Sequence, residues 1–185
     1  MAGLRVIGGI AKGRRLRRVP GEGTRPIGDR PKESLFNIIG ADIEDSRFLD
    51  LFAGTGSVGI EALSRGAAFS AFVDSAAAAI RVVNDNLSAT GSAAKAVVVQ
   101  QDAFTYLRAS PDSAFDYVFV APPQYHGLWL KAVRALDVWP GGLSEDAWVI
   151  VQVDPREAEE EGLSQLSRFD ERLYGQTMLR FYRAK

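Results

Sequence analysis

The sequence predicts an α/β fold with a doubly wound, mostly parallel sheet of seven strands, and three observations support this prediction. From residue 47 onward, short apolar runs alternate with amphipathic segments of helical length, as in a parallel sheet covered by helices on both faces. A glycine-rich turn joins the first of these runs to its helix. The last two apolar segments flank Gly175, which predicts an antiparallel C-terminal hairpin at the sheet edge.

The individual elements follow from the order of the apolar runs. Two short apolar and basic segments near the N-terminus predict a small β-hairpin. A helix should follow from Asp29, its expected cap, to Gly40, where glycine favours helix termination. Strands and helices then alternate to the end of the chain. The expected strands are 47–52, 69–73, 96–100, 115–120, 147–151, 168–174 and 178–183, and the helices among them are 57–65, 76–89, 103–109 and 126–137.

Basic residues gather at the N-terminus, although the whole chain has a net charge of −1. Residues 1–32 contain nine Lys or Arg and two Asp or Glu, a net charge of +7, and the remainder carries −8. We therefore divide the chain into a basic arm, 1–28, and a body, 29–185. Such an arm indicates an anionic polymer as partner; the alternative is an ordinary solvated surface. The candidate contacts are Arg5, Lys12, Arg14, Arg15, Arg17, Arg18, Arg25 and Arg30.

The first strand of the body leads into a turn with two glycines, Gly54 and Gly56. Glycine permits positive φ and lets a ligand approach the backbone closely. Ser57 follows and is the expected cap of the next helix. A strand, glycine turn and helix in this order are typical of Rossmann-like folds, in which the free N–H groups of the helix face the ligand.

Acidic residues accompany three successive predicted strands, at the end where ligands bind in doubly wound sheets. Asp74 follows Gly54 by 20 residues, the spacing at which an acid reaches ribose hydroxyls. Asp102 with Ala103 suits an adenine amino group. Asp50 favours a cationic ligand and argues against the pyrophosphate of a dinucleotide. The alternative for both Asp50 and Asp102 is a capping role in a loop or helix.

In combination these features resemble the class I S-adenosylmethionine-dependent methyltransferases. The shared features are Asp-Leu-Phe-Ala-Gly-Thr-Gly at 50–56, the acids after the second and third strands, and a Pro-Pro pair after the fourth. The N-terminal part resembles the RsmD family, which methylates a guanine N2 in 16S ribosomal RNA. The segments that carry this resemblance are 5–9, 12–14, 24–26 and 29–38, and the likeness extends over nearly the whole chain.

The resemblance implies S-adenosylmethionine as methyl donor, S-adenosylhomocysteine as product, and small-subunit ribosomal RNA or the assembled small subunit as substrate. It implies RNA contacts by the arm, with Arg30 and Glu33 near the mouth of the site. The implied cofactor-binding residues are Asp50, Ala53, Gly54, Thr55, Gly56, Asp74, Ser75, Asp102 and Ala103.

The expected catalytic loop follows the strand at 115–120. The family has Asp or Asn, two prolines and an aromatic residue here; the acid and a proline carbonyl hold the amine, and the ring stacks on the flipped base. This sequence reads Ala121-Pro122-Pro123-Gln124-Tyr125, so the acid is missing and the aromatic residue comes one position later. By analogy, losing one preorganised hydrogen-bonding group raises a barrier by about 2.7–4 kcal/mol.

This departure leaves three interpretations open. Gln124 or another acceptor replaces the acid, the enzyme is slow, or the protein binds RNA and cofactor without methylating. The group that receives the methyl is open as well, because Pro-Pro loops also bind the amines of adenine N6 and of glutamine side chains. The basic arm argues against a protein glutamine.

The residue inventory narrows the remaining function classes. The chain has no cysteine and a single histidine, His126, which argues against thiolate or multi-histidine metal sites. No apolar run is long enough to span a bilayer and the start does not resemble a signal peptide. We therefore expect a cytoplasmic monomer with no metal and no membrane partner.

Overall fold

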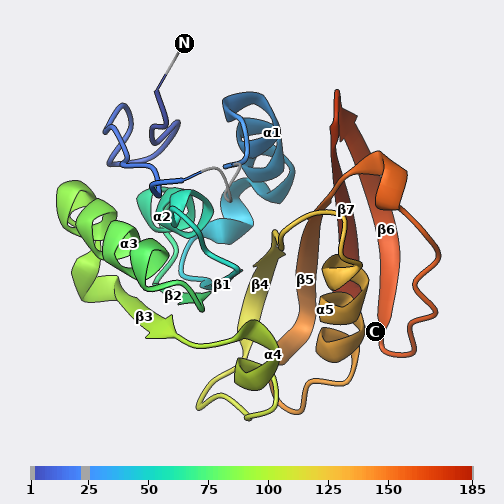
Figure 1. Ribbon diagram of the computed structural model, residues 1–185. Helices are drawn as coiled ribbons and strands as arrows, with labels where there is room; N and C mark the ends of the chain where they lie inside the picture. The colour runs from blue at the N-terminus through green and yellow to red at the C-terminus, as the bar shows by residue number, and fades with distance from the viewer. Residues whose placement is uncertain (1–2, 22–25, 185) are drawn as a thin grey trace.

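The computed structural model describes residues 3–21 and 26–184, and its centre is a seven-stranded sheet flanked by helices (Figure 1). The strand order is β3-β2-β1-β4-β5-β7-β6. The first five strands in this order are parallel, and β7 pairs antiparallel with both β5 and β6. The predicted doubly wound sheet with an antiparallel C-terminal hairpin is confirmed.

The elements lie close to the predicted ranges. The largest difference is β5, which is six residues longer than expected because it starts and ends beyond the apolar run at 147–151. The strands are β1 Arg47–Leu51, β2 Phe69–Asp74, β3 Ala96–Gln100, β4 Phe115–Val120, β5 Leu143–Val153, β6 Leu166–Tyr174 and β7 Thr177–Ala184. The α-helices are α1 Asp29–Ile39, α2 Ser57–Ser64, α3 Ala77–Thr90, α4 Ala103–Tyr106 and α5 Leu128–Asp137, with 3₁₀ turns η1 Gly40–Ile43, η2 Ala93–Lys95 and η3 Pro155–Glu157.

Asp29 and Ser57 were expected to cap α1 and α2, and both predictions are wrong. Gly28 and Gly56 occupy the N-cap positions of α1 and α2, and neither helix has a side-chain cap. Asp29 lies in the first turn of α1 and accepts a hydrogen bond from Arg5 instead. Gly56 is left-handed, with φ 73°, and an added Cβ would lie within 3.2 Å of Val83; this tight contact favours glycine there. Gly40 ends α1 as predicted.

The strands bury both faces of the sheet. On one face of the sheet, Phe48 and Phe119 pack beneath α1, α2 and α3. On the other face, Leu49 and Val118 pack beneath α4 and α5. The alternation of these neighbours along β1 and β4 is the period of two that a strand imposes. Nearly continuous apolar strands are typical of parallel sheets covered on both sides.

The basic arm packs onto this body along α2. Its expected hairpin is reduced to one antiparallel bridge, between Arg5 and Arg15, with flanking backbone hydrogen bonds. Glu61 of α2 is fully buried and its carboxylate accepts the N–H groups of Ile7 at 2.8 Å and Gly8 at 2.7 Å. The apolar residues of the arm share the core that α1 and α2 form; they are Leu4, Val6, Ala11, Leu16 and Ile27.

Candidate cofactor site and substrate edge

The predicted cofactor residues meet at the carboxyl edge of the sheet, where β1, β2 and β3 end side by side. The glycine turn follows β1 and is held by the next strand, because Ala53 donates its N–H to the carbonyl oxygen of Val73 at 2.9 Å. Phe52 begins the turn with φ 64°, an uncommon conformation for an aromatic residue. This strained position next to the site was not foreseen from the sequence.

Asp50 lies beneath the turn and is 2% exposed. Its carboxylate accepts the N–H of Gly59, in the first turn of α2, at 2.9 Å. Burial raises the pKa of Asp50 to about 7, partly countered by the hydrogen bond from Gly59 and reinforced by the charge of Asp74. Because the hydrogen bond from Gly59 compensates little of its buried negative charge, this carboxylate is suited to a cationic ligand. Both of the expected roles, capping and attraction of a cation, are compatible with this geometry.

Asp74 holds the turn from the end of β2. One carboxylate oxygen accepts the N–H of Gly54 and the other accepts the N–H of Ala76, at 2.8 and 2.9 Å. Each oxygen keeps a second lone pair, so the carboxylate can still accept hydroxyl hydrogens. Ser75 is exposed beside it.

Asp102 caps α4, which was the alternative interpretation of this residue. Oδ1 accepts the N–H and the hydroxyl of Thr105 at 2.8 and 3.1 Å, and Oδ2 makes no hydrogen bond within the described residues. The next residues complete a small apolar wall: Ala103 is buried, and the ring of Phe104 meets Phe52 edge to face at 6.0 Å. This combination offers one free acceptor beside an apolar surface.

The loop after β4 lies next to the glycine turn, because Ala121 donates its N–H to Leu51 at 3.4 Å. Ala121 and Gln124 are half-buried, Pro122 is buried, and Pro123 is exposed. The five expected catalytic residues therefore stand at the carboxyl edge, one strand away from Asp50.

Tyr125 of this loop is anchored to the end of β5. It has φ 65° and is 57% exposed. Its hydroxyl donates to Asp154 Oδ2 at 2.7 Å and accepts from Arg156, whose guanidinium lies 5.2 Å from the ring centroid. Arg156 also donates to both oxygens of Asp154. The hydrogen bonds from Arg156 and Tyr125 lower the pKa of Asp154, and donating to that carboxylate raises the pKa of Tyr125.

Asp154 and Arg156 were missed by the sequence analysis. The available signal was the position of Asp154 directly after an apolar strand, the same signal that identified Asp74 and Asp102. Because the predicted strand ended at residue 151, three positions before Asp154, this residue was not recognised as lying at the carboxyl edge of the sheet.

The basic side chains of the arm mostly face solvent. Arg5 pairs with Asp29 at 3.2 Å and Arg17 with Asp85 at 2.8 Å, while both arginine side chains remain more than half exposed. Arg25 lies outside the described residues. The other expected contacts are exposed; they are Lys12, Arg14, Arg15, Arg18 and Arg30.

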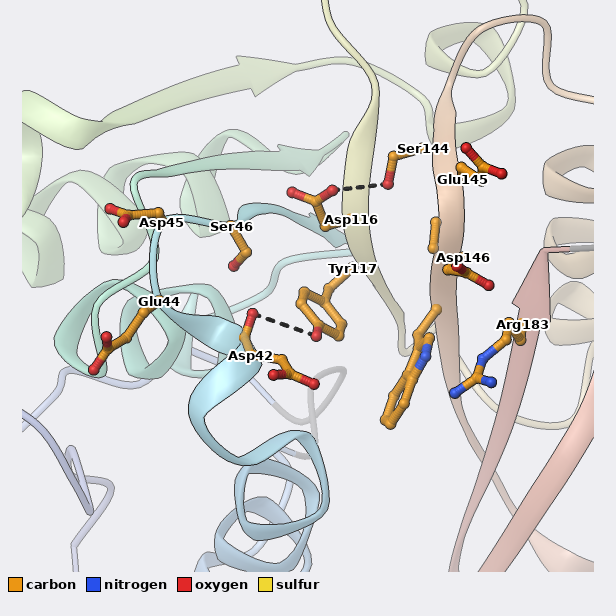
Figure 2. Close-up of a pocket in the computed structure, with 12 residues that line it drawn as sticks. Asp42, Glu44, Asp45, Ser46, Asp116, Tyr117, Ser144, Glu145, Asp146 and Arg183 are labelled. Carbon is orange, nitrogen blue, oxygen red and sulfur yellow. Dashed lines mark hydrogen bonds between the residues drawn. The ribbon is translucent and has the colours of Figure 1, made fainter.

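A hollow lies at the opposite edge of the sheet, where β4 and β5 begin (Figure 2). It has a volume of about 450 Å³ and contains none of the predicted site residues. Its charged lining consists of six acids and Arg183; the acids are Asp42, Glu44, Asp45, Asp116, Glu145 and Asp146.

In residues 3–21 and 26–184, no group of three or more His, Asp or Glu side chains is arranged to hold a metal ion. Within the same ranges, no helix combines the length and apolarity that crossing a bilayer requires.

The chain is similar to several known proteins over nearly its whole length. It is 38% identical over 184 residues to YlbH of Bacillus subtilis, named as a candidate rRNA methyltransferase, covering 98% of this chain and 100% of that one. It is 35% identical over 179 residues to ribosomal RNA small subunit methyltransferase D of Escherichia coli, covering 97% and 89%.

A solved structure and a family model agree with these relatives. The structure of yhhF from Escherichia coli, described as a methyltransferase candidate, superposes with a TM-score of 0.87 at 33% identity, covering 100% of this chain and 99% of that one. The family model described as "Conserved hypothetical protein 95" matches residues 4–183. The chain therefore belongs to this family, the RsmD family of methyltransferases.

Proposed function

We propose that this protein transfers a methyl group from S-adenosylmethionine to the N2 amine of a guanine in 16S ribosomal RNA. One observation carries the proposal: three carboxylates, Asp50, Asp74 and Asp102, end three adjacent strands around a glycine turn, one strand from a Pro-Pro loop. The relatives named as rRNA methyltransferases support the RNA substrate.

The residues of the turn fit the methyl donor. Asp50 would attract its positive charge, Asp74 would accept hydrogen bonds from its ribose, and Asp102 Oδ2 would accept from its adenine amino group. Ala53, Thr55 and Ser75 would border the same ligand. The donor supplies a methyl group that a nucleophile can attack directly, because the cationic sulfur is a good leaving group.

The loop after β4 would position the guanine amine. An exocyclic amine is a weak nucleophile because its lone pair is delocalised into the ring. The carbonyl oxygen of Pro122 can accept one amine hydrogen, which holds the nitrogen in line and compensates its developing positive charge. As the C–N bond forms and the C–S bond breaks, the nitrogen releases a proton to solvent.

Gln124 is our candidate for the second acceptor, because Ala121 has no side-chain oxygen. Gln124 lies three residues further along the same loop and is half-buried, and its amide oxygen can accept a hydrogen bond. Tyr125 has Arg156 on its ring and more than half of its surface exposed, so the open part of the ring can stack on a flipped base.

The arm would bind the phosphate backbone with its exposed Arg and Lys side chains, and Arg30 on α1 would extend this surface. Phosphate contacts position an RNA without reading its sequence. We further propose that the protein acts as a monomer in the cytoplasm, on ribosomal RNA or on the assembled small subunit.

The test is methyl transfer from tritiated S-adenosylmethionine to small ribosomal subunits from cells that lack the enzyme, followed by mass analysis of the nucleosides. We expect N2-methylguanosine. N6-methyladenosine would contradict the proposed base. Binding of donor and subunits without any incorporation would contradict the proposed chemistry.

A further inference from the structure

Asn86 connects the basic arm to the glycine turn. It lies in α3 and is 1% exposed. Its Oδ1 accepts the backbone N–H of Arg17 at 2.7 Å, and its Nδ2 donates to the carbonyl oxygens of Arg17 at 3.1 Å and Thr55 at 2.9 Å. One amide group thus binds backbone atoms of two segments that are far apart in the sequence.

The chemistry of these contacts requires a primary amide. The side chain needs an acceptor oxygen and a nitrogen with two N–H donors on the same carbon, which among short side chains only asparagine provides. Both donors are used, and a buried donor without an acceptor would be unfavourable. Asparagine has no special preference for helix interiors, so helix formation alone does not account for this residue.

The two segments that Asn86 joins belong to the two binding surfaces of the proposed function. Thr55 lies between Gly54 and Gly56, in the turn that faces the methyl donor. Arg17 lies in the arm, with a side chain that is 75% exposed. The remaining side-chain anchors of the arm backbone attach to α2 or α1, through Glu61, Ser64 and Lys32.

We propose that Asn86 is a positioning residue that couples RNA binding by the arm to cofactor binding by the glycine turn. This inference rests on the proposed function. When RNA orders the arm, or the cofactor orders the glycine turn, the amide of Asn86 also orders the other of these two segments. The second ligand then loses less free energy in ordering its own segment. Such coupling is reciprocal, and each ligand should tighten the other by the same factor.

The first experiment compares Asn86→Asp with Asn84→Asp. The carboxylate in Asn86→Asp keeps the size and the acceptor but loses both donors and faces two carbonyl oxygens. Asn84 lies on the same helix, is exposed, and within the described residues bonds only to the carbonyl oxygen of Ile80, so its variant makes the same charge change without touching either segment.

The measured quantity is the ratio of two dissociation constants for small ribosomal subunits, obtained by filter binding without and with saturating S-adenosylhomocysteine. The product is used because no methyl transfer can follow. We expect a ratio of at least about 5 for the wild type and Asn84→Asp, in the usual range of coupling factors, and about 1 for Asn86→Asp. A loss of stability or a change in charge alone would affect both constants and leave their ratio unchanged.

A second pair of variants changes the arm and leaves α3 intact. Arg17→Pro and Arg17→Ala remove the same charge, but only proline removes the N–H that Asn86 accepts. We expect Arg17→Ala to keep the wild-type ratio and Arg17→Pro to lower it towards 1.

The outcomes separate the two proposals. A wild type that binds both ligands with a ratio of 1, or an Arg17→Pro variant that keeps the wild-type ratio, would overturn the role of Asn86 and leave the proposed function intact. A wild type that binds neither ligand would overturn the proposed function and this inference with it.

Discussion

Tyr125, in the loop after β4, donates its hydroxyl hydrogen to Asp154 at the end of β5, over 2.7 Å. The loop that would hold the methyl acceptor is therefore fixed to the neighbouring strand by a side chain, and Arg156 completes the contact by bonding to both partners. These three residues form an anchor that holds the loop in one position relative to β5.

Removing the anchor should reduce turnover more than binding. Tyr125→Phe keeps the ring for stacking and removes the hydroxyl. We expect kcat to fall by tenfold or more, up to the roughly hundredfold loss that a misplacement of about 1 Å can cause, with little change in KM. Steady-state methyl transfer measures both. Tyr106→Phe, at a hydroxyl without a hydrogen bond in the described residues, is the control; equal losses in both variants would contradict the role of the anchor.

Cofactor affinity should depend on pH through Asp50. Because its pKa in the folded protein is about 7, against 3.8 as the ordinary value, a cationic ligand must compete with a proton below pH 7. We expect the affinity for S-adenosylmethionine to fall up to about tenfold per pH unit below 7 and to level off above it. Calorimetric titration from pH 5.5 to 8.5 measures this. A flat profile in the wild type would refute it, and Asp50→Asn should bind weakly with a flat profile.

The same carboxyl group should affect stability in the absence of ligand. An acid whose pKa is raised on folding holds its proton more tightly in the folded state, so stability falls as pH rises from about 4 to about 7. The full difference is on the order of 4 kcal/mol. Asp50→Asn should therefore raise the free energy of unfolding at pH 8, as measured by urea titration; a less stable variant at that pH would contradict the assignment.

Glu61 should be essential for docking of the arm. Glu61→Gln removes the charge of a buried carboxylate. This carboxylate accepts the N–H groups of Ile7 and Gly8 and pairs with Arg65 at 2.9 Å and Lys32 at 3.5 Å. Breaking a buried ion pair from one side costs about 3–5 kcal/mol, and urea unfolding should show a loss of this size. Glu33→Gln, on the exposed face of α1, should change stability by less than about 0.5 kcal/mol.

RNA affinity should lose part of its salt dependence when the arm is neutralised. Changing Arg14, Arg15, Arg17 and Arg18 together to alanine should reduce the slope of log affinity against log salt by roughly 3, since each phosphate contact contributes about 0.7–0.9. Filter binding at several salt concentrations gives the slope. Arg108→Ala, beyond α4, is the single-charge control. An unchanged slope in the fourfold variant would remove the arm from the RNA interface.

Restoring an acid in the loop should increase the rate. Ala121→Asp adds the side-chain acceptor that this loop lacks, and we expect kcat to rise by up to about the hundredfold that one such group can contribute. A rate equal to that of the wild type would mean that Gln124 already fulfils this role, and Gln124→Ala should then be the variant that loses activity.

The strands were predictable because the central strands are buried on both faces, which leaves apolar runs such as 69–73 and 115–120 with clear ends. The position of Asp50, Asp74 and Asp102 at one edge was predictable for a related reason, since a parallel sheet brings the ends of its strands together. Asp154 was missed because polar Gln152 ended the apolar run before the strand itself ended.

The caps and the arm depended on contacts that no local pattern contains. Gly56 takes the cap position of α2 because Val83 and Phe72 approach it from elsewhere in the chain. The sequence predicted a small hairpin for the arm but not its partners, because its backbone is bound by Glu61 and Asn86, more than 50 residues further along the chain. Such partners become visible only in the folded structure.

The acid-lined hollow of Figure 2 and the basic arm carry charges of opposite sign. Surfaces of opposite sign turn a protein in the field of a polyanion before the two touch. If the arm binds RNA as we propose, an approaching RNA should attract the arm and repel the hollow. We therefore expect the hollow to raise the rate of association without contacting the RNA.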